Sequence, residues 1–290
     1  MLSHVIDLLA DPIDLSPLHG EDDFSRLVSE SGHSYDVARQ GYVTLAGGAG
    51  LRYGGDDTQM INDRETFLSR GHYAPFVEAV TEAVGEIIDE AGIPDDAEPA
   101  ICEVGAGTGY YLSHMLDSID GSRGIGLDVS IPSAKKLAKC HPRVGAVVAD
   151  AWATLPIRDN CVDAIAVVFA PRNASEFARV LKPGGQVVVL TADTGHLDEL
   201  REPLGIIGVE KGKVQRMIDQ ARDHLVPVGP SEPVQFKMQL DQGSIATQIG
   251  MSPSARHIHP DVLAERIATL PTTMEVTARA MITRFKKVEA

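Results

Sequence analysis

Apolar and polar positions along the middle of the chain predict a parallel sheet covered by helices. Five short runs are apolar at nearly every position, which is typical of strands buried on both faces. Helical patterns that begin near Tyr110, Ser133 and Ala174 separate several of these runs. The predicted strands are AICEV (100–104), RGIGLD (123–128), GAVVAD (145–150), VDAIAVVF (162–169) and GQVVVLT (185–191). Strands that alternate with helices in this way predict an α/β fold.

The ends of the chain carry different patterns. The first fifty residues hold short apolar runs interrupted by DP, SP and HG and end in a glycine-rich stretch, which indicates a small module and a flexible link. Residues 76–91 have apolar residues at helical spacing. Near the C-terminus, VQFKMQLD (234–241) and EVTARAMITRF (275–285) look like two more strands, with helical segments around Ile245 and over residues 260–270.

These patterns divide the chain into three predicted parts. Residues 1–50 form a small N-terminal module, and residues 51–95 form a linker and a lid helix. Residues 96–290 form the α/β domain, whose sheet is mostly parallel with a C-terminal antiparallel strand.

Composition and charge narrow the class of protein. Hydrophobic residues make up 43% of the 290 positions and charged residues 23%, as in soluble globular proteins. The N-terminus lacks the pattern of a secretory signal and no apolar run is long enough for a membrane helix, so we expect a cytoplasmic protein. Cys102, Cys140 and Cys161 form no CxxC pair, which argues against a disulfide framework or a thiolate zinc site.

The negative charge is concentrated in the first part of the chain. Residues 1–100 contain 5 Lys and Arg against 20 Asp and Glu, whereas residues 101–290 contain 21 of each. An acidic surface repels the phosphates of nucleic acids, so RNA is not expected to dock on the N-terminal part. A solvated acidic face that favours solubility is the simpler interpretation of this excess.

A glycine-rich turn follows the first predicted strand in CEVGAGTGYYLSHML (102–116). In a doubly wound sheet, ligands bind where such a turn opens at the carboxyl ends of the strands. A dinucleotide fingerprint places its third glycine three residues after the second, but here Gly109 comes two residues after Gly107. EVGAGTG instead resembles motif I of the class I S-adenosylmethionine-dependent methyltransferases, which implies a Rossmann-like methyltransferase domain.

Two further strand ends match that pattern. Asp128 lies 19 residues after Gly109, close to the spacing of about 20 residues at which a carboxylate accepts ribose hydroxyls. By the same resemblance, Asp150 and Trp152 hold the adenine. Either aspartate could instead cap the following helix. The residues predicted to contact S-adenosyl-L-methionine are Tyr73, Glu103, Gly105, Ala106, Gly107, Gly109, Asp128, Val129, Asp150, Ala151 and Trp152.

Several other stretches are similar to one narrower family. They are GHSYDVARQGYVTL (32–45), GDDTQMINDRETFLSRGHYAP (55–75), FAPRN (169–173) and HLDEL (196–200). Together they resemble the bacterial 23S ribosomal RNA guanine-N1 methyltransferases of the tylosin-resistance type. The resemblance implies methyl transfer from S-adenosylmethionine to N1 of a guanine in large-subunit ribosomal RNA. The alternative is a methyltransferase on the same scaffold that acts on a small metabolite or natural product.

The resemblance is weakest in the N-terminal module. The family opens with a zinc module patterned C-P-x-C-x-x-P-L and then C-x-x-G-H. The matching stretches here are DPIDLSPL (11–18) and SESGH (29–33), so the thiolate positions hold Asp11, Asp14 and Ser29 and only His33 remains. Structural zinc prefers thiolates and imidazoles. We therefore predict a degenerate zinc-finger-like module without metal.

The candidates for the chemistry follow the fourth predicted strand and precede the lid helix. Phe169 and Pro171 could wall a base, and Arg172 could hold a phosphate or stack on the base. His72, with Arg64 and Asp57 nearby, could meet the substrate. The competing interpretation is that Pro171 ends a strand and His72 is a cap or surface residue. The general base is left open, and so is the oligomeric state, with a homodimer as one alternative.

Overall fold

The large sheet has nine strands in the residues that the computed structural model describes, which are 1–48, 50–51, 53–94 and 97–288. The order is β10-β12-β9-β8-β5-β6-β7-β4, with β11 paired to β12. The strands are β4 (Tyr42–Thr44), β5 (Ala100–Val104), β6 (Arg123–Asp128), β7 (Val144–Val148), β8 (Val162–Val168), β9 (Leu181–Ala192), β10 (Leu225–Pro227), β11 (Glu232–Asp241) and β12 (Thr273–Lys287).

Strand directions confirm the predicted sheet. Strands β4 to β9 pair in parallel, and every residue of β5 and β7 is buried, as their continuous apolar runs predict. The long strand β12 pairs antiparallel with β9, β10 and β11. Along β12, buried positions alternate with more exposed ones, because one of its faces packs on the core and the other is partly exposed. The predicted C-terminal antiparallel strand is therefore β12.

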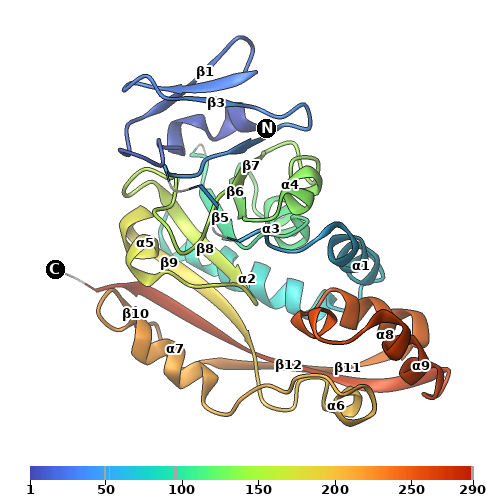
Figure 1. Ribbon diagram of the computed structural model, residues 1–290. Helices are drawn as coiled ribbons and strands as arrows, with labels where there is room; N and C mark the ends of the chain where they lie inside the picture. Colours follow the sequence, from blue (N-terminus) through green and yellow to red (C-terminus); the bar gives the residue numbers. More distant parts are fainter. Residues whose placement is uncertain (49, 52, 95–96, 289–290) are drawn as a thin grey trace.

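Helices cover the sheet on both faces (Figure 1). They are α1 (Thr58–Ser69), α2 (Ala74–Glu90), α3 (Tyr110–Ser118), α4 (Ile131–Leu137), α5 (Ala174–Val180), α6 (Asp198–Leu204), α7 (Lys213–Ala221), α8 (Gln242–Gly250) and α9 (Pro260–Ala268), with short 3₁₀ turns at Leu2–His4, Ile6–Leu8 and Pro253–Arg256. One apolar cluster joins α2, α3 and α8 to the sheet, and a second joins α5 and α7 to its other face. Among the described residues, no helix has both the length and the apolar character needed to cross a bilayer.

The N-terminal segment completes the second face of the sheet. Strands β1 (Leu18–Glu21), β2 (Arg26–Ser29) and β3 (Ser34–Asp36) form a small antiparallel sheet at one end of the molecule (Figure 1). Val5 and Leu9 are fully buried in the same apolar cluster as Val147 of β7. Gly145 permits this contact, because a Cβ at that position would lie 2.2 Å from Cγ2 of Val5.

The three-part division of the chain stays a prediction. Strand β4, which lies inside residues 1–50, pairs with β7 and so belongs to the large sheet. The second predicted boundary, at residues 95 and 96, lies outside the described residues. Helix α2 occupies most of the predicted lid-helix range.

Hydrogen bonds to one buried carboxylate tie the N-terminal module together. Asp11 is 0% exposed, and its Oδ1 accepts from the backbone N–H of Ile13 at 2.8 Å and from the Tyr35 hydroxyl at 2.9 Å. Its Oδ2 lies 2.8 Å from Nδ1 of His33. Burial alone would raise the pKa of Asp11, but its hydrogen bonds outweigh burial and hold that pKa below its usual range.

Replacing Asp11 with Asn is expected to destabilise the protein and to flatten its acid sensitivity. Loss of the charged acceptor lowers the free energy of unfolding by about 1–3 kcal/mol at pH 7. Because folding depresses the pKa of Asp11, its contribution is full above its unfolded-state value near pH 4 and is lost as pH falls through the folded-state value. Denaturant titrations at about pH 7, 5 and 3 measure both effects.

Asp23→Asn, a change of the same kind at an exposed turn residue, serves as the control and is expected to alter stability little. An excess of chelator is expected to leave the unfolding midpoint of the wild-type protein unchanged. A large drop in that midpoint on chelation, or stoichiometric zinc in the purified protein, would show that metal rather than the Asp11 hydrogen bonds organises the module.

Candidate functional site

A cavity of about 1200 Å³ opens at the carboxyl ends of the parallel strands. Residues from the ends of β5, β6, β7 and β8 form one side of it, and residues 53–73 and 248–257 contribute the facing side. Strand-end residues in the lining are Glu103, Gly105, Ala106, Asp128, Val129, Asp150, Ala151, Trp152, Phe169, Ala170, Pro171 and Arg172. This is the edge at which open α/β sheets bind their ligands.

The glycine turn after β5 forms the floor of the cavity because it fits closely against β6 and β8. The N–H groups of Gly105 and Ala106 donate to the carbonyl of Leu127 at 2.8 and 2.9 Å. Gly105 has φ +73°, and a Cβ there would lie 2.4 Å from Cβ of Ala170. Gly109 has φ +80° and begins α3 against Cys140. Only glycine combines these conformations with such close approach.

Two carboxyl groups flank the turn, Glu103, which is buried, and Asp128, which is partly buried. Oε2 of Glu103 accepts from the backbone N–H of Leu112 at 3.0 Å, and burial raises its pKa well above the usual range. Asp128 accepts from the N–H groups of Gly107 and Ser130, both at 2.8 Å, and burial raises its pKa too. These bonds hold the Asp128 side chain in place in the cavity wall.

Asp150 and Trp152 lie together at the end of β7. Oδ1 of Asp150 accepts from the N–H of Trp152 at 2.9 Å, which forms a tight turn. The indole is 63% exposed although it lines the cavity. A large aromatic side chain so exposed leaves its face free for a planar ligand.

Aromatic rings form the wall beyond the end of β8. The ring centroid of Phe169 lies 5.7 Å from Phe76, 6.3 Å from Tyr73 and 6.1 Å from His196. Phe169 has φ +52°, which is rare for a bulky residue and indicates backbone strain. Its ring is 44% exposed in the cavity lining. The predicted group Phe169, Pro171 and Arg172 therefore shares one wall.

His72 lies apart from the described lining of the cavity. Its Nε2 is 2.9 Å from Oγ of Ser244 in α8, so the ring faces the helix rather than the site. Burial lowers the pKa of His72. The neighbouring residue, Tyr73, does line the cavity and is buried. The two predicted lid residues therefore point to different places.

Three lining residues carry polar atoms that have no hydrogen-bond partner among the described residues. They are Nε of Arg64, the hydroxyl of Tyr111 and Oε1 of Gln248. Arg64 also donates to Oδ2 of Asp56 at 2.5 Å and to the carbonyl of Met251 at 3.1 Å. Unpartnered buried polar groups are costly, and in a cavity they are candidates for contact with a ligand.

The sequence alone indicates no role for His196 or Gln248. His196 stands in the quoted HLDEL stretch, but its neighbours gave no sign of burial beside Tyr73. Gln248 lies in α8, 139 residues after Gly109 at the end of the glycine turn, so only the fold brings it to the cavity.

Basic side chains gather at one part of the cavity. Arg172, Lys213 and Arg216 all contribute to the lining. Nη1 of Arg172 donates to the Thr191 hydroxyl at 3.2 Å, and Arg216 pairs with Glu210 at 2.6 Å. Burial and the two nearby arginines lower the pKa of Lys213. Glu210 offsets part of this charge, and the net positive charge of the group favours an anionic ligand.

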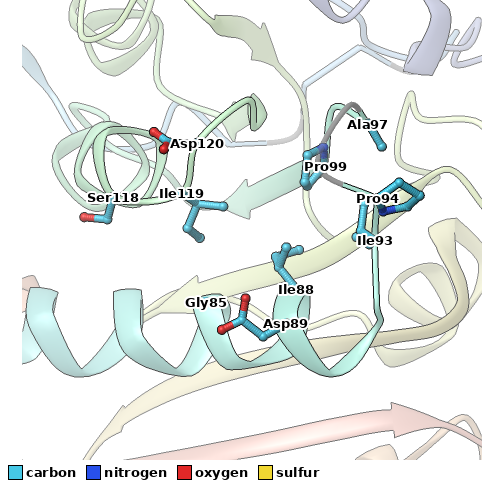
Figure 2. Close-up of a pocket in the computed structure, with 10 residues that line it drawn as sticks. All are labelled: Gly85, Ile88, Asp89, Ile93, Pro94, Ala97, Pro99, Ser118, Ile119 and Asp120. Atoms are coloured by element: carbon cyan, nitrogen blue, oxygen red, sulfur yellow. The ribbon is translucent and has the colours of Figure 1, made fainter.

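A second hollow, of about 670 Å³, lies elsewhere on the molecule (Figure 2). Gly85, Ile88 and Asp89 of α2 line it on one side, opposite Ile119 beyond the end of α3. Pro99, which also lines it, directly precedes β5. The hollow is therefore at the amino ends of the parallel strands, opposite the edge where such sheets bind ligands.

The N-terminal module contains a group of side chains with metal-ligand chemistry. Ligand atoms of Asp11, Asp14 and His33 all lie within 4.8 Å of one another. Oδ1 and Oδ2 of Asp11 are already engaged by Tyr35 and His33. The absence of metal from this module stays a prediction.

Comparison with known proteins agrees with this geometry. A family model described as a methyltransferase domain matches residues 101–185. The 23S rRNA (guanine(748)-N(1))-methyltransferase of Streptomyces fradiae is 38% identical to this chain, and the match covers 98% of each chain. A protein of Micromonospora griseorubida, whose name assigns it guanine-N(1) methylation of 23S rRNA, is 39% identical over 96% of each chain. Both matches include the N-terminal segment as well as the cavity.

Solved structures match this chain at lower identity. A SAM-dependent methyltransferase of Thiobacillus denitrificans, in complex with S-adenosyl-L-homocysteine, is 16% identical to this chain, with a TM-score of 0.42. The match covers 72% of this chain and 91% of that protein.

Proposed function

Because this chain belongs to the family of 23S rRNA guanine-N(1) methyltransferases, we propose that it transfers a methyl group from S-adenosyl-L-methionine to N1 of a guanine in 23S ribosomal RNA. The observation that carries the proposal is the near end-to-end match to these relatives, 96–98% of each chain. A cavity with suitable walls at the carboxyl ends of β5 to β8 supports it.

The residues of the cavity fit S-adenosyl-L-methionine. The glycine turn provides close backbone approach for the amino-acid part, and Asp128 provides a carboxylate for the ribose hydroxyls. Asp150 and the exposed face of Trp152 suit the adenine. Nε of Arg64 and the hydroxyl of Tyr111, which lack a hydrogen-bond partner in the described part of the chain, offer further donors. When bound, the cofactor supplies a methyl group on a positively charged sulfur.

The aromatic wall suits a planar base. Bases in RNA are commonly recognised after they leave the stack and lie against aromatic side chains. The exposed ring of Phe169 provides such a surface, and Arg172 and Lys213 provide cations for the phosphates on either side of the base. Methyl transfer needs the acceptor nitrogen in line with the sulfonium methyl, so this wall has to hold the base rigidly and exclude water.

His196 does not act as a base through Nε2. Nδ1 of His196 accepts from the backbone N–H of Arg279 at 3.0 Å, so the proton of the neutral ring is on Nε2. Burial lowers its pKa to about 4, which keeps the ring neutral at pH 7. Guanine N1 carries a proton at neutral pH, and its removal therefore falls to another group.

The charge distribution suggests how RNA approaches. The first 100 residues carry all of the net charge of −15 and repel phosphates. Lys213 and Arg216 lie on the cavity in the part of the chain whose charges balance. We therefore place the RNA over α7 and the end of β8 in this proposal.

Replacing Asp128 with Ala is expected to weaken binding of S-adenosyl-L-homocysteine by about 1–3 kcal/mol, because the ribose hydroxyls lose a charged acceptor. Isothermal titration calorimetry measures the affinity. Asp120→Ala, at the second hollow, removes a carboxylate from the opposite edge of the sheet and is expected to bind the ligand as the wild type does. Equal affinities of all three proteins would disprove the assignment of Asp128.

Deletion of the gene is expected to remove one N1-methylguanine from the 23S ribosomal RNA of the organism that carries it. N1 methylation blocks Watson–Crick pairing, so reverse transcription stops at the modified base in wild-type RNA and reads through in the deletion strain. Mass spectrometry of nuclease fragments locates the same loss. Complementation with the wild-type gene restores the stop, and complementation with the Asp128→Ala gene restores it poorly.

An unchanged methylation map would contradict the proposal. Transfer of a radiolabelled methyl group to a small metabolite, with none to ribosomal RNA, would then support the small-molecule alternative.

A further inference from the structure

Three polar side chains from distant parts of the chain meet at the aromatic wall. Tyr73 directly precedes α2, His196 lies between β9 and α6, and Gln248 belongs to α8. All three line the cavity. The ring centroids of Tyr73 and His196 each lie within 6.3 Å of Phe169. A base held against Phe169 therefore has these polar groups within reach of its edge.

The direction of each hydrogen bond follows from the chemistry of the groups. His196 carries its proton on Nε2, because Nδ1 accepts from the backbone N–H of Arg279. Nε2 of His196 is 3.4 Å from the Tyr73 hydroxyl, so the ring donates to that oxygen. Nε2 of Gln248 donates to the same oxygen at 3.3 Å.

These two bonds occupy both acceptor positions of the Tyr73 oxygen. A phenol oxygen has two lone pairs and one hydrogen, so the hydrogen of Tyr73 remains to be donated. Burial raises the pKa of Tyr73 to about 12, which keeps that hydrogen in place at pH 7. Nε2 of Gln248 donates to Tyr73. Oε1 of Gln248 is buried without a hydrogen-bond partner among the described residues.

The wall therefore offers a ligand one donor, the Tyr73 hydroxyl, and one acceptor, Oε1 of Gln248. The Watson–Crick edge of guanine has an acceptor, O6, on one side of N1 and a donor, the N2 amino group, on the other. Adenine offers an amino donor in place of O6 and has no amino group at C2. A donor and an acceptor fixed side by side thus match guanine and leave adenine unsatisfied, which is how a buried site rejects the wrong ligand.

We propose that Tyr73 and Gln248 read the target base, with the Tyr73 hydroxyl donating to guanine O6 and Oε1 of Gln248 accepting from the N2 amino group. His196 is a positioning residue, because its bond to Tyr73 fixes where the hydroxyl hydrogen points. This inference rests on the proposed function and adds to it the residues that select the base. The two contacted groups flank N1, so these contacts also fix where N1 lies in the cavity.

Inosine provides the test because it differs from guanosine only in lacking the N2 amino group. Two stem-loop transcripts are compared as substrates, one with the mapped guanosine and one with inosine at that position. The wild-type enzyme is expected to favour guanosine by about 10- to 100-fold in kcat/KM. Gln248→Leu is expected to lose most of this preference, by slowing the guanosine transcript far more than the inosine transcript.

Tyr73→Phe is expected to give the complementary pattern. Both transcripts contain O6, so loss of the hydroxyl slows the two by a similar factor, about 10-fold, and keeps the preference for guanosine. Gln248→Glu retains an oxygen where Oε1 lies and is expected to keep a measurable preference. Gln242→Leu, a change on the same helix whose amide donates to the carbonyl of Leu270, is expected to behave as the wild type.

Calorimetry with S-adenosyl-L-homocysteine accompanies each variant, and unchanged affinity shows that the fold and cofactor pocket are intact. Equal loss of activity on both transcripts in Gln248→Leu would overturn the inference, since it indicates a structural role for Gln248. A wild-type enzyme without preference between guanosine and inosine would also overturn it. A wild-type enzyme that methylates neither transcript would overturn the proposed function and this inference with it.

Discussion

The contact between the glycine turn and the end of β6 determines the rest of the site. Three successive backbone N–H groups, from Gly105 to Gly107, donate to the Leu127 carbonyl and the Asp128 carboxylate. Two neighbouring strands are thereby held with their carboxyl ends at one level. The floor of the cavity needs no side chains at this place, because glycine lets the main chain itself form the surface. The other walls are arranged around this fixed point.

The wall opposite the strands is assembled from both ends of the sequence. Arg64 of α1 links the two segments of this wall, because its guanidinium donates to Asp56 and to the Met251 carbonyl beyond α8. Tyr73 and Gln248 meet in the same way. The cavity is therefore closed only when the segment before β5 and the segment between β11 and β12 have both folded, which couples the two ends of the chain to the methyltransferase sheet.

The sequence predicts what depends on local patterns. Periodicity predicts the buried strands and the helix that the structure shows as α2. Residue types at fixed spacing predict the glycine turn and the aspartate at the end of β6. Helix α1 carries no comparable pattern, because only part of one face is buried. His196 and Gln248 were missed for a different reason: each is one polar residue whose meaning comes from partners more than 100 residues away. His72 and Tyr73 are adjacent in the sequence, and only their tertiary contacts show that His72 faces α8 while Tyr73 lines the cavity.

The packing of Val5 into the space left by Gly145 has a consequence for folding during synthesis. A ribosome makes the first residues of this chain long before β7, so the apolar side chains of Leu2, Val5 and Leu9 leave the exit tunnel without their partner strand. Such long-range contacts form slowly, and exposed apolar segments favour aggregation in the meantime. The surplus of Asp and Glu in the first 100 residues gives the nascent chain a net negative charge until β7 has been made. Like charges on a chain oppose its association with other copies, so this charge counteracts aggregation while those apolar residues lack their partner strand.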